Sequence, residues 1–348
     1  MLSILNQIKY YSNKNSTPVS LKYLLNYGQN FKNNSFQHSQ FLHKELPIRI
    51  SKRILNLQDL PYELNKYSSI QEIHDLYIDS FKKLIKQKEP ICKRDCQEYT
   101  KLLLNLRNKH KDTEFNIARC LVSFKNKYSN HQDFSSNIDK TLNIFYESRI
   151  GLRLLTGHHI SLNENNISKN NIGIIHKFKI EKILENCISE IEHLFELQYS
   201  QIPKIKIQSL NSKDLIHIPN HVHYILFEIL KNSMQAVLKN NNQMEDIMVN
   251  LVHHKDGVTI DIFDKGGGFK FKDKDKVFSF LYTTNDLLET NYHHTPISGF
   301  GHGLGMSKLY IEYFGGELNI LPLEGYGTRT IINLKSLNIK EKIADHKF

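Results

Sequence analysis

Hydrophobic residues in the first half of the chain recur every three or four positions. Glycine is nearly absent between residues 41 and 162. Apolar stripes with this spacing run through residues 46–57, 70–84, 103–124 and 144–155. This spacing places the apolar side chains on one face of each helix, and four such faces most simply pack against one another. We therefore predict a four-helix bundle over residues 35–172.

The pattern changes after Gly173. An amphipathic helix is predicted at 180–195, and two further helices are predicted after Asn220 and at 304–314. Strand-like runs occur at residues 203–208, 246–252, 258–263, 317–321 and 328–334. Strands with hairpin links and three helices predict an α/β sandwich, with the helices on one face of a mixed sheet. We assign residues 173–338 to this domain, followed by a short tail at 339–348.

Composition agrees with two folded domains. The chain has 348 residues, of which 40% are hydrophobic and 24% charged, as in ordinary globular proteins. No run approaches the roughly 18 apolar residues of a membrane-spanning helix, so we do not expect an integral membrane protein. Four cysteines are too few for a disulfide framework, which favours a reducing compartment.

The net charge of +10 depends partly on the amino-terminal segment. The first acidic residue is Glu45, and residues 1–34 contain four lysines among many Ser, Asn and Tyr. Such a segment is typical of a mitochondrial transit peptide, although arginine is missing; a disordered tail is the alternative. We predict a transit peptide at residues 1–34 and a location in the mitochondrial matrix. Without those lysines the charge falls to +6, and we expect no nucleic-acid partner.

Four motifs in the second half carry candidate chemistry. Glu228 and Asn232 are four residues apart on a predicted helix, so their side chains share one face. An amide oxygen suits Mg²⁺ and a carboxylate can act as a base; a solvated polar face is the alternative. Asp264, which glycines follow as far as Gly268, ends a strand. Its carboxylate could accept the exocyclic amino hydrogen of adenine, unless the segment is simply a turn.

Glycines at 299, 301, 303 and 305 open the last predicted helix, where backbone N–H groups and the helix dipole favour phosphate. This is not a Walker loop, because no Lys-Ser or Lys-Thr follows, nor a Rossmann loop, because no parallel βαβ unit surrounds it. The fourth motif is Gly325-Tyr326-Gly327-Thr328. Histidine pairs such as His158-His159 lack zinc-site spacing, and we do not expect structural zinc.

The order ExxxN, DxGGG, GxGxG and GxGT resembles the GHKL ATP-binding fold, and residues between Gly268 and Gly299 resemble its mobile ATP lid. From Phe41 onward the chain also resembles the mitochondrial 2-oxo-acid dehydrogenase kinases, over about 300 residues. The matching segments are FLHKELPIRI, IHDLYIDSF, SRIGLRLL, FEILKNSMQA, DKGGGF, LYTTN, GFGHGLGMSKLYIEYFGGEL and GYGTRT.

This resemblance implies a protein-serine kinase that uses MgATP to inactivate the E1-type α subunit of a 2-oxo-acid dehydrogenase complex. Glu228 would be the catalytic base, Asn232 the Mg²⁺ ligand and Asp264 the adenine contact. K⁺ is a further candidate ion. The implied nucleotide-binding residues are Glu228, Ile229, Leu230, Lys231, Asn232, Ser233, Met234, Gln235, Asp264, Gly266, Gly268, Thr283, Thr284, Gly299, Phe300, Gly301, His302, Gly303, Leu304 and Thr328.

The resemblance also implies partners. The helical domain would dock the lipoyl domain of the complex's acyltransferase core, and the kinase would form a homodimer. Arg149 and Arg153, four residues apart on one helix face, match the family's pocket for 2-oxo-acid regulators. Arginines paired with neighbouring carboxylates are the alternative. His110 lies on an apolar stripe, and we interpret it as a buried structural histidine.

Within the family the branched-chain enzymes are the nearer match, with the pyruvate enzymes as the alternative. Residues 157–159, GHH, resemble the branched-chain THH, and Tyr224 stands where the pyruvate enzymes carry histidine. A chain without Trp also lacks their Asp-Trp tail anchor. Gln235 and Arg329 depart from both branches, which usually show Arg and often Asp there.

Two other functions remain open. A histidine autokinase is one, because His43-Lys44-Glu45-Leu46-Pro47 superficially resembles a sensor-kinase phosphoacceptor box. The other is a non-catalytic protein that binds the dehydrogenase complex.

Overall fold

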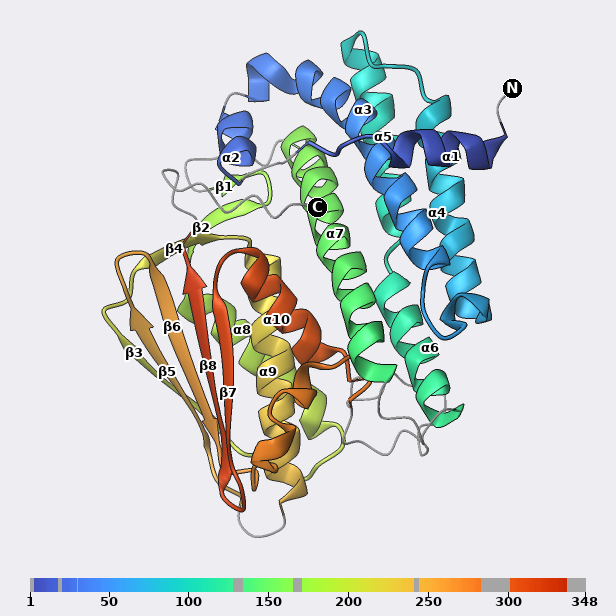
Figure 1. Ribbon diagram of the computed structural model, residues 1–348. Helices are drawn as coiled ribbons and strands as arrows, with labels where there is room; N and C mark the ends of the chain where they lie inside the picture. The colour runs from blue at the N-terminus through green and yellow to red at the C-terminus, as the bar shows by residue number, and fades with distance from the viewer. Residues whose placement is uncertain are drawn as a thin grey trace. The chain divides into compact units, whose positions relative to one another are not determined.

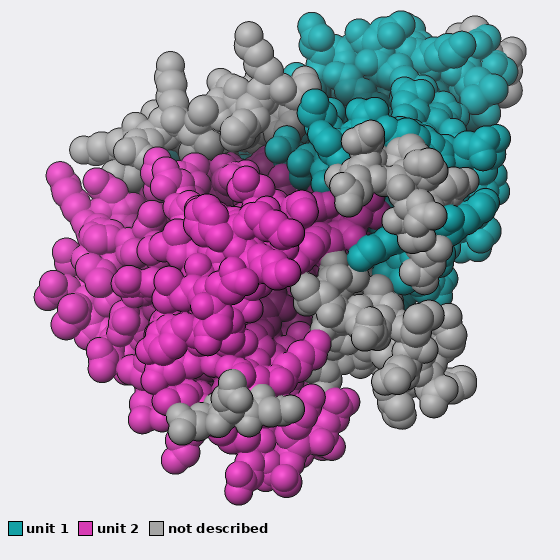
Figure 2. Space-filling view, turned by 60° about the horizontal axis from the view of Figure 1, so that its bottom comes forward, with its two compact units in different colours: residues 1–175, 339–348 teal, residues 176–338 magenta. Residues whose placement is uncertain are grey.

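The computed structural model describes residues 3–17, 21–29, 31–127, 134–164, 171–240, 244–282 and 301–336. The chain divides between Ile175 and His176 into two compact units, coloured separately in Figure 2. Unit 1 covers residues 1–175 together with 339–348, and unit 2 covers residues 176–338. The predicted tail, residues 339–348, lies outside the described residues.

Unit 1 is built from helices, as predicted (Figure 1). Its elements are α1 (Ile4–Ser12), α2 (Leu21–Gln29), α3 (Phe31–Gln58), a 3₁₀ turn (Leu64–Lys66), α4 (Ser68–Lys86), α5 (Lys93–Lys109), α6 (Thr113–Lys127), α7 (Phe134–Asn163) and the short strand β1 (Asn171–Ile172). On α4 the buried residues Ile70, Ile73, Tyr77, Phe81 and Leu84 follow the three- and four-residue spacing that predicted this helix.

Two helix boundaries differ from the predictions. The stripe at 103–124 is not one helix but α5 and α6, because α5 ends at Lys109. His110 caps α5, and its carbonyl accepts a hydrogen bond from Arg149 Nη2 at 2.6 Å. The helix predicted from residue 46 begins at Phe31 and contains Pro47. Proline is favoured in the first turn of a helix, so Pro47 favoured a start that the structure does not use.

The segment interpreted as a transit peptide contains α1 and α2, in which Ile8, Leu24 and Leu25 are buried. A buried ion pair on α3, Glu45 with Arg49, forms hydrogen bonds to the backbone of Thr17, which follows α1. Glu45 Oε1 accepts the N–H of Thr17 at 2.9 Å, Arg49 Nη2 donates to the carbonyl of Thr17 at 2.7 Å, and Arg49 Nε donates to Glu45 Oε1 at 2.7 Å. Cleavage at residue 34 stays a prediction, but these described residues contribute to the core of unit 1.

Unit 2 combines a sheet with three long helices. Its elements are β2 (Ile175–Lys179), α8 (Ile180–Glu196), β3 (Ile205–Leu210), β4 (Asp214–His217), α9 (Pro219–Lys239), β5 (Ile247–His253), β6 (Gly257–Asp264), two 3₁₀ turns (Phe271–Asp273 and Lys276–Phe278), α10 (Gly303–Tyr313), β7 (Glu317–Leu323) and β8 (Gly327–Lys335). The four-residue strand β4, which pairs antiparallel with β2, was not predicted.

The main sheet is mixed, as predicted, with strand order β3-β5-β6-β8-β7. Only the β3–β5 pair is parallel; the other three pairs are antiparallel. Burial alternates along β6 and β7, so each strand has a buried face and a more exposed face. Helices α8, α9 and α10 cover one face of the sheet (Figure 1), and none of the described helices of unit 2 lies on the other face. The α/β sandwich is therefore confirmed.

Among the described residues, no helix is both long and apolar enough to cross a membrane.

Candidate active site

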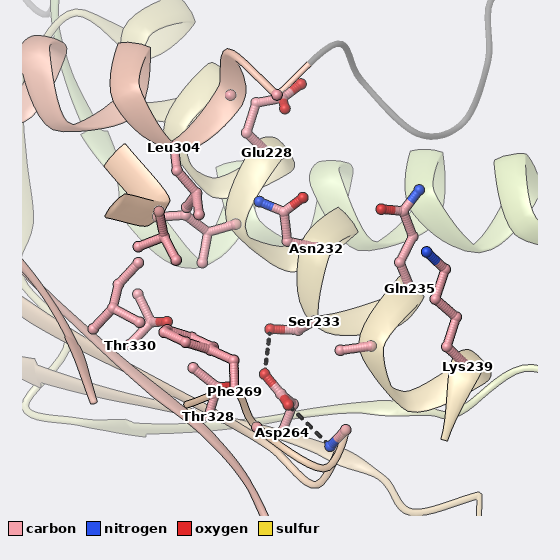
Figure 3. A pocket seen from close by; sticks show the side chains of 18 of the residues that line it. Glu228, Asn232, Ser233, Gln235, Lys239, Asp264, Phe269, Leu304, Thr328 and Thr330 are labelled. Carbon is pink, nitrogen blue, oxygen red and sulfur yellow. Dashed lines mark hydrogen bonds between the residues drawn. The ribbon is translucent and has the colours of Figure 1, made fainter. Parts of the chain in front are cut away.

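A cavity of about 500 Å³ lies in unit 2, bordered by α9, the start of α10 and the covered face of the sheet (Figure 3). Its described lining is Glu228, Ile229, Asn232, Ser233, Gln235, Ala236, Lys239, Asn240, Asp264, Gly266, Gly268, Phe269, Val277, Tyr282, Gly301, Gly303, Leu304, Ile320, Thr328 and Thr330. The four motifs, scattered over 100 residues of sequence, thus meet at one hollow.

The α9 side of the cavity carries polar groups on successive turns. Glu228, Asn232 and Ser233 project from α9 into the view of Figure 3, as the four-residue spacing required. Glu228 Oε1 pairs with Lys231 Nζ at 2.7 Å. The other oxygen of Glu228 lies at the start of α10, where a Cβ on Gly303 would come within 2.1 Å of it. Only glycine lets the backbone of α10 approach this carboxylate so closely.

Asp264 forms the floor of the cavity at the end of β6. Its Oδ2 accepts the hydroxyl of Ser233 at 3.0 Å and its Oδ1 accepts the N–H of Gly266 at 3.0 Å. Burial raises the pKa of this carboxyl, and the hydrogen bonds from Gly266, Ser233 and Thr328 oppose that shift. Gly266 packs directly on α9, since a Cβ there would lie 2.4 Å from Ala236 Cβ. The carboxylate is thus held in place by two donors of the fold.

The lining suits a phosphate-bound Mg²⁺ better than a metal cage. Among the described residues, no group of three or more His, Cys, Asp or Glu side chains is arranged to hold a metal. Asn232 offers one hard amide oxygen inside the cavity. Mg²⁺ typically takes one or two protein ligands and completes its shell with phosphate oxygens and water.

Comparison with known proteins identifies the family to which the chain is similar. A family model described as "Histidine kinase-, DNA gyrase B-, and HSP90-like ATPase" matches residues 217–338, and one described as "Mitochondrial branched-chain alpha-ketoacid dehydrogenase kinase" matches residues 18–176. The Homo sapiens pyruvate dehydrogenase (acetyl-transferring) kinase isozyme 4 is 30% identical, over 95% of this chain and 84% of its own. The Arabidopsis thaliana mitochondrial pyruvate dehydrogenase kinase is 30% identical over 96% and 94%, respectively.

The chain belongs to the mitochondrial 2-oxo-acid dehydrogenase kinase family. It is an ATP-dependent protein kinase, and residues 217–338 are its ATPase-like domain. The Mus musculus pyruvate dehydrogenase kinase isozyme 1 is 28% identical over 97% of this chain and 81% of its own.

Not every predicted nucleotide-binding residue lines the cavity of the kinase. Twelve of them line it: Glu228, Ile229, Asn232, Ser233, Gln235, Asp264, Gly266, Gly268, Gly301, Gly303, Leu304 and Thr328. The helical turn of α9 directs Leu230, Lys231 and Met234 into buried surroundings instead, and His302 is buried beside Phe280. The predicted residues Thr283, Thr284, Gly299 and Phe300 lie outside the described part of the chain.

Several lining residues of the kinase were not predicted from the sequence. Ala236 and Asn240 continue the face of Glu228 and Asn232 in steps of four, so helical periodicity alone could have found them. Phe269 and Tyr282 belong to the segment between Gly268 and Gly299 that was predicted as a lid, but neither was singled out. Burial and strand position place Ile320 and Thr330, and no motif marks either one.

The two departures from the family have different settings. Gln235 lines the cavity. Arg329 instead forms two hydrogen bonds of 2.8 Å to the carboxylate of Asp261, on the neighbouring strand β6. This exposed bidentate pair accounts for an arginine at position 329 without any role in ATP binding.

The predicted regulator residues lie together in unit 1, but they differ in surroundings. Arg149 is 1% exposed; it donates to Glu114 Oε1 at 3.0 Å, to the carbonyl of His110 at 2.6 Å and to Tyr77 Oη at 3.4 Å. Arg153 lines a small cavity of about 30 Å³ together with Arg149 and Arg107. Arg107 is a third guanidinium that the sequence analysis missed, because it lies on α5 and shares no spacing with α7.

His110 borders the same cavity and is buried, as interpreted from sequence. Burial, and then the charges of Arg149 and Arg153, lower its pKa to about 3. Its Nε2 forms a 2.8 Å hydrogen bond with the Ser80 hydroxyl. The ring is therefore neutral at physiological pH and serves the packing of helices α4, α5 and α7.

Proposed function

We propose that this kinase transfers the γ-phosphoryl group of MgATP to a serine of the E1-type α subunit of a mitochondrial 2-oxo-acid dehydrogenase complex and thereby inactivates it. The observation that carries the proposal is the presence of Glu228, Asn232 and Asp264 in one cavity. A base, a metal ligand and an adenine acceptor are the groups that this reaction requires.

In this proposal Asp264 accepts the amino hydrogen of adenine, and the start of α10 offers backbone N–H groups to the phosphates. Asn232 would hold Mg²⁺, which neutralises phosphate charge when bound. Glu228 receives the proton of the serine hydroxyl as the Oγ–Pγ bond forms and the bond from Pγ to ADP breaks, with its electron pair leaving on ADP. K⁺ stays a prediction, and no described group is assigned to it.

We propose a branched-chain 2-oxo-acid dehydrogenase as the substrate complex. Tyr224 and the His158-His159 pair support this choice, and so does the branched-chain description of the family model that matches residues 18–176. Pyruvate dehydrogenase is the second candidate, because it is named in the relatives that align with most of the chain.

The proposal includes partners and location. We infer that the kinase is located in the mitochondrial matrix, because its relatives are named as mitochondrial. We also infer that unit 1 docks on a lipoyl domain. A homodimer is supported by the helix-free face of the sheet, which exposes Val252, Leu321 and Leu323.

We also propose that a 2-oxo-acid regulator binds at Arg153 in unit 1. Arg149 is already engaged by Glu114, Tyr77 and the carbonyl of His110, so Arg107 and Arg153 are the better candidates for the regulator's carboxylate. A cavity of about 30 Å³ holds roughly one water molecule, so a regulator must displace side chains in order to enter.

The decisive experiment offers purified branched-chain and pyruvate dehydrogenase complexes to the same kinase with MgATP. We expect acid-stable phosphoserine on one α subunit and a loss of that complex's activity. Glu228→Gln should lower transfer by about 10²–10⁴-fold while nucleotide binding persists. Acid-labile phosphate on His43 would favour the autokinase, and complex binding without ATP turnover would favour the non-catalytic protein.

A further inference from the structure

Lys231 is a buried lysine directly behind the proposed base. It is 7% exposed and does not line the cavity, and its Nζ lies 2.7 Å from Glu228 Oε1. The same ammonium lies 5.5 Å from the centre of the Phe227 ring. Burying an ammonium group is costly unless it is paired, so this contact restrains both side chains.

The carboxylate of Glu228 is held from two sides. Lys231 contacts Oε1, while Oε2 lies against Gly303 at the start of α10, the positive end of that helix. Both neighbours present positive charge to the carboxylate and hold its two oxygens in place. Because Glu228 lines the cavity and Lys231 does not, the ammonium can fix the base without occupying space that the substrates need.

We propose that Lys231 is a positioning residue that clamps Oε1 of Glu228 and so presents Oε2 to the serine hydroxyl. This inference rests on the proposed role of Glu228. Lys231 itself gains and loses no proton: the serine proton passes to Oε2 and leaves to water after ADP dissociates. Phosphoryl transfer depends mainly on position and charge neutralisation, so the placement of the base is what Lys231 contributes.

The aromatic neighbour one turn earlier on α9 lies elsewhere. The ring of Tyr224 meets the ring of Tyr310 edge to face, with centroids 5.4 Å apart. Tyr224 therefore contributes to the contact between α9 and α10, and the pair of Glu228 with Lys231 supplies the charged contact at the base.

The test compares Lys231→Met, Lys231→Arg and the control Lys206→Met. We expect Lys231→Met to lower kcat roughly tenfold to a hundredfold, because a displacement of about 1 Å can cost that much. KM for ATP and the affinity for ADP should stay close to those of the unchanged kinase. Lys231→Arg should recover part of kcat, since a guanidinium can still donate to Oε1.

Lys206 is a matched control on β3. Its Nζ pairs with Asp246 at 2.6 Å, but its side chain is 58% exposed and far from the lining residues in sequence and strand position. Lys206→Met removes the same group from a solvated pair and should leave kcat and KM unchanged.

Combination with Glu228→Gln separates the two levels of the proposal. If Lys231 acts only through Glu228, Lys231→Met should lower kcat no further in the Glu228→Gln background. Full activity of Lys231→Met beside an inactive Glu228→Gln would overturn the inference and leave the proposed function intact. Full activity of Glu228→Gln would instead show that Glu228 is not the catalytic base, and the proposed mechanism itself would fail.

A loss of ADP affinity as large as the loss of kcat would also overturn the inference, because Lys231 would then contact the nucleotide. Thermal unfolding of each variant tests folding. If Lys231→Met does not fold, Lys231→Gln, which is polar but carries no charge, decides instead: a folded Lys231→Gln with unchanged kcat would contradict a positioning role.

Discussion

In unit 1 the Arg149 guanidinium donates to groups from α4, α6 and the end of α5, whereas in unit 2 the Glu228 carboxylate has one oxygen on Lys231 and faces a cavity. Both are buried or nearly buried charges with a partner of opposite sign. The difference is what remains for a ligand. A charge whose hydrogen bonds are all made within the fold holds helices together, and a charge with capacity left toward a cavity is available for chemistry.

The largest expected effect tests the structural member of this comparison. Arg149→Met leaves Glu114 and the carbonyl of His110 without their donor, and breaking a buried ion pair by removing one partner costs about 3–5 kcal/mol. Urea unfolding should show that loss. Arg329→Met is the control: it breaks an exposed bidentate pair, so its loss of stability should be clearly smaller. Similar losses for the two variants would mean that Arg149 is not the bond between these helices.

Neutral buried histidines extend the comparison to pH. Burial lowers the pKa of His158 to about 4, and the hydrogen bond between its Nε2 and the carbonyl of Leu24 opposes that shift. The unfolded chain, with a histidine pKa near 6.5, binds this proton more readily, so the free energy of unfolding falls as pH drops from about 6.5 toward 4.

The slope expected from one such histidine is about 1.4 kcal/mol per pH unit. His158→Gln keeps a donor for the carbonyl of Leu24 but does not titrate. We expect urea unfolding at pH 7 and pH 5 to differ less in this variant than in the unchanged kinase, by up to that amount per pH unit. An unaltered pH dependence would show that His158 is accessible to protons in the folded state.

The smallest effect concerns the adenine side of the cavity. Ser233→Ala removes the hydroxyl that Asp264 Oδ2 accepts, and a hydrogen bond to a charged group contributes about 1.5–3 kcal/mol. Because Gly266 N–H still holds the other oxygen, we expect the low end, about a tenfold weaker ATP affinity with kcat unchanged. Ser209→Ala, which removes a 2.7 Å contact with Glu181 outside the cavity, is the control for isothermal titration.

Sequence predicts a position well when one local rule determines it. Glu228, Asn232 and Asp264 were found because helix period and strand ends place them, and glycines such as Gly266 mark close backbone approaches. The surroundings of Arg107 and Lys231 could not be predicted, for the opposite reason. Arg107 reaches the Arg153 cavity from a different helix, and the direction of Lys231 depends on what packs around α9.

Boundaries followed the same division. The apolar stripe at 103–124 continues through the break between α5 and α6, since a change of helix need not disturb the spacing of buried residues. The acid-free composition of residues 1–34 predicts recognition by an import machinery, but it does not predict which of these residues are buried in the fold. Ile8, Leu24 and Leu25 are apolar and are buried in the core, although the residues around them in sequence are mostly polar or basic.

A recombinant form of the kinase has to include Thr17, because Glu45 and Arg49 form hydrogen bonds to its backbone. A gene that starts at codon 35 would supply Glu45 and Arg49 without the backbone that they grip, and His158 without the carbonyl of Leu24. The product would carry vacated apolar surface and would be prone to aggregate during purification, however intact its ATP site. Primers designed upstream of Ser3 avoid that outcome.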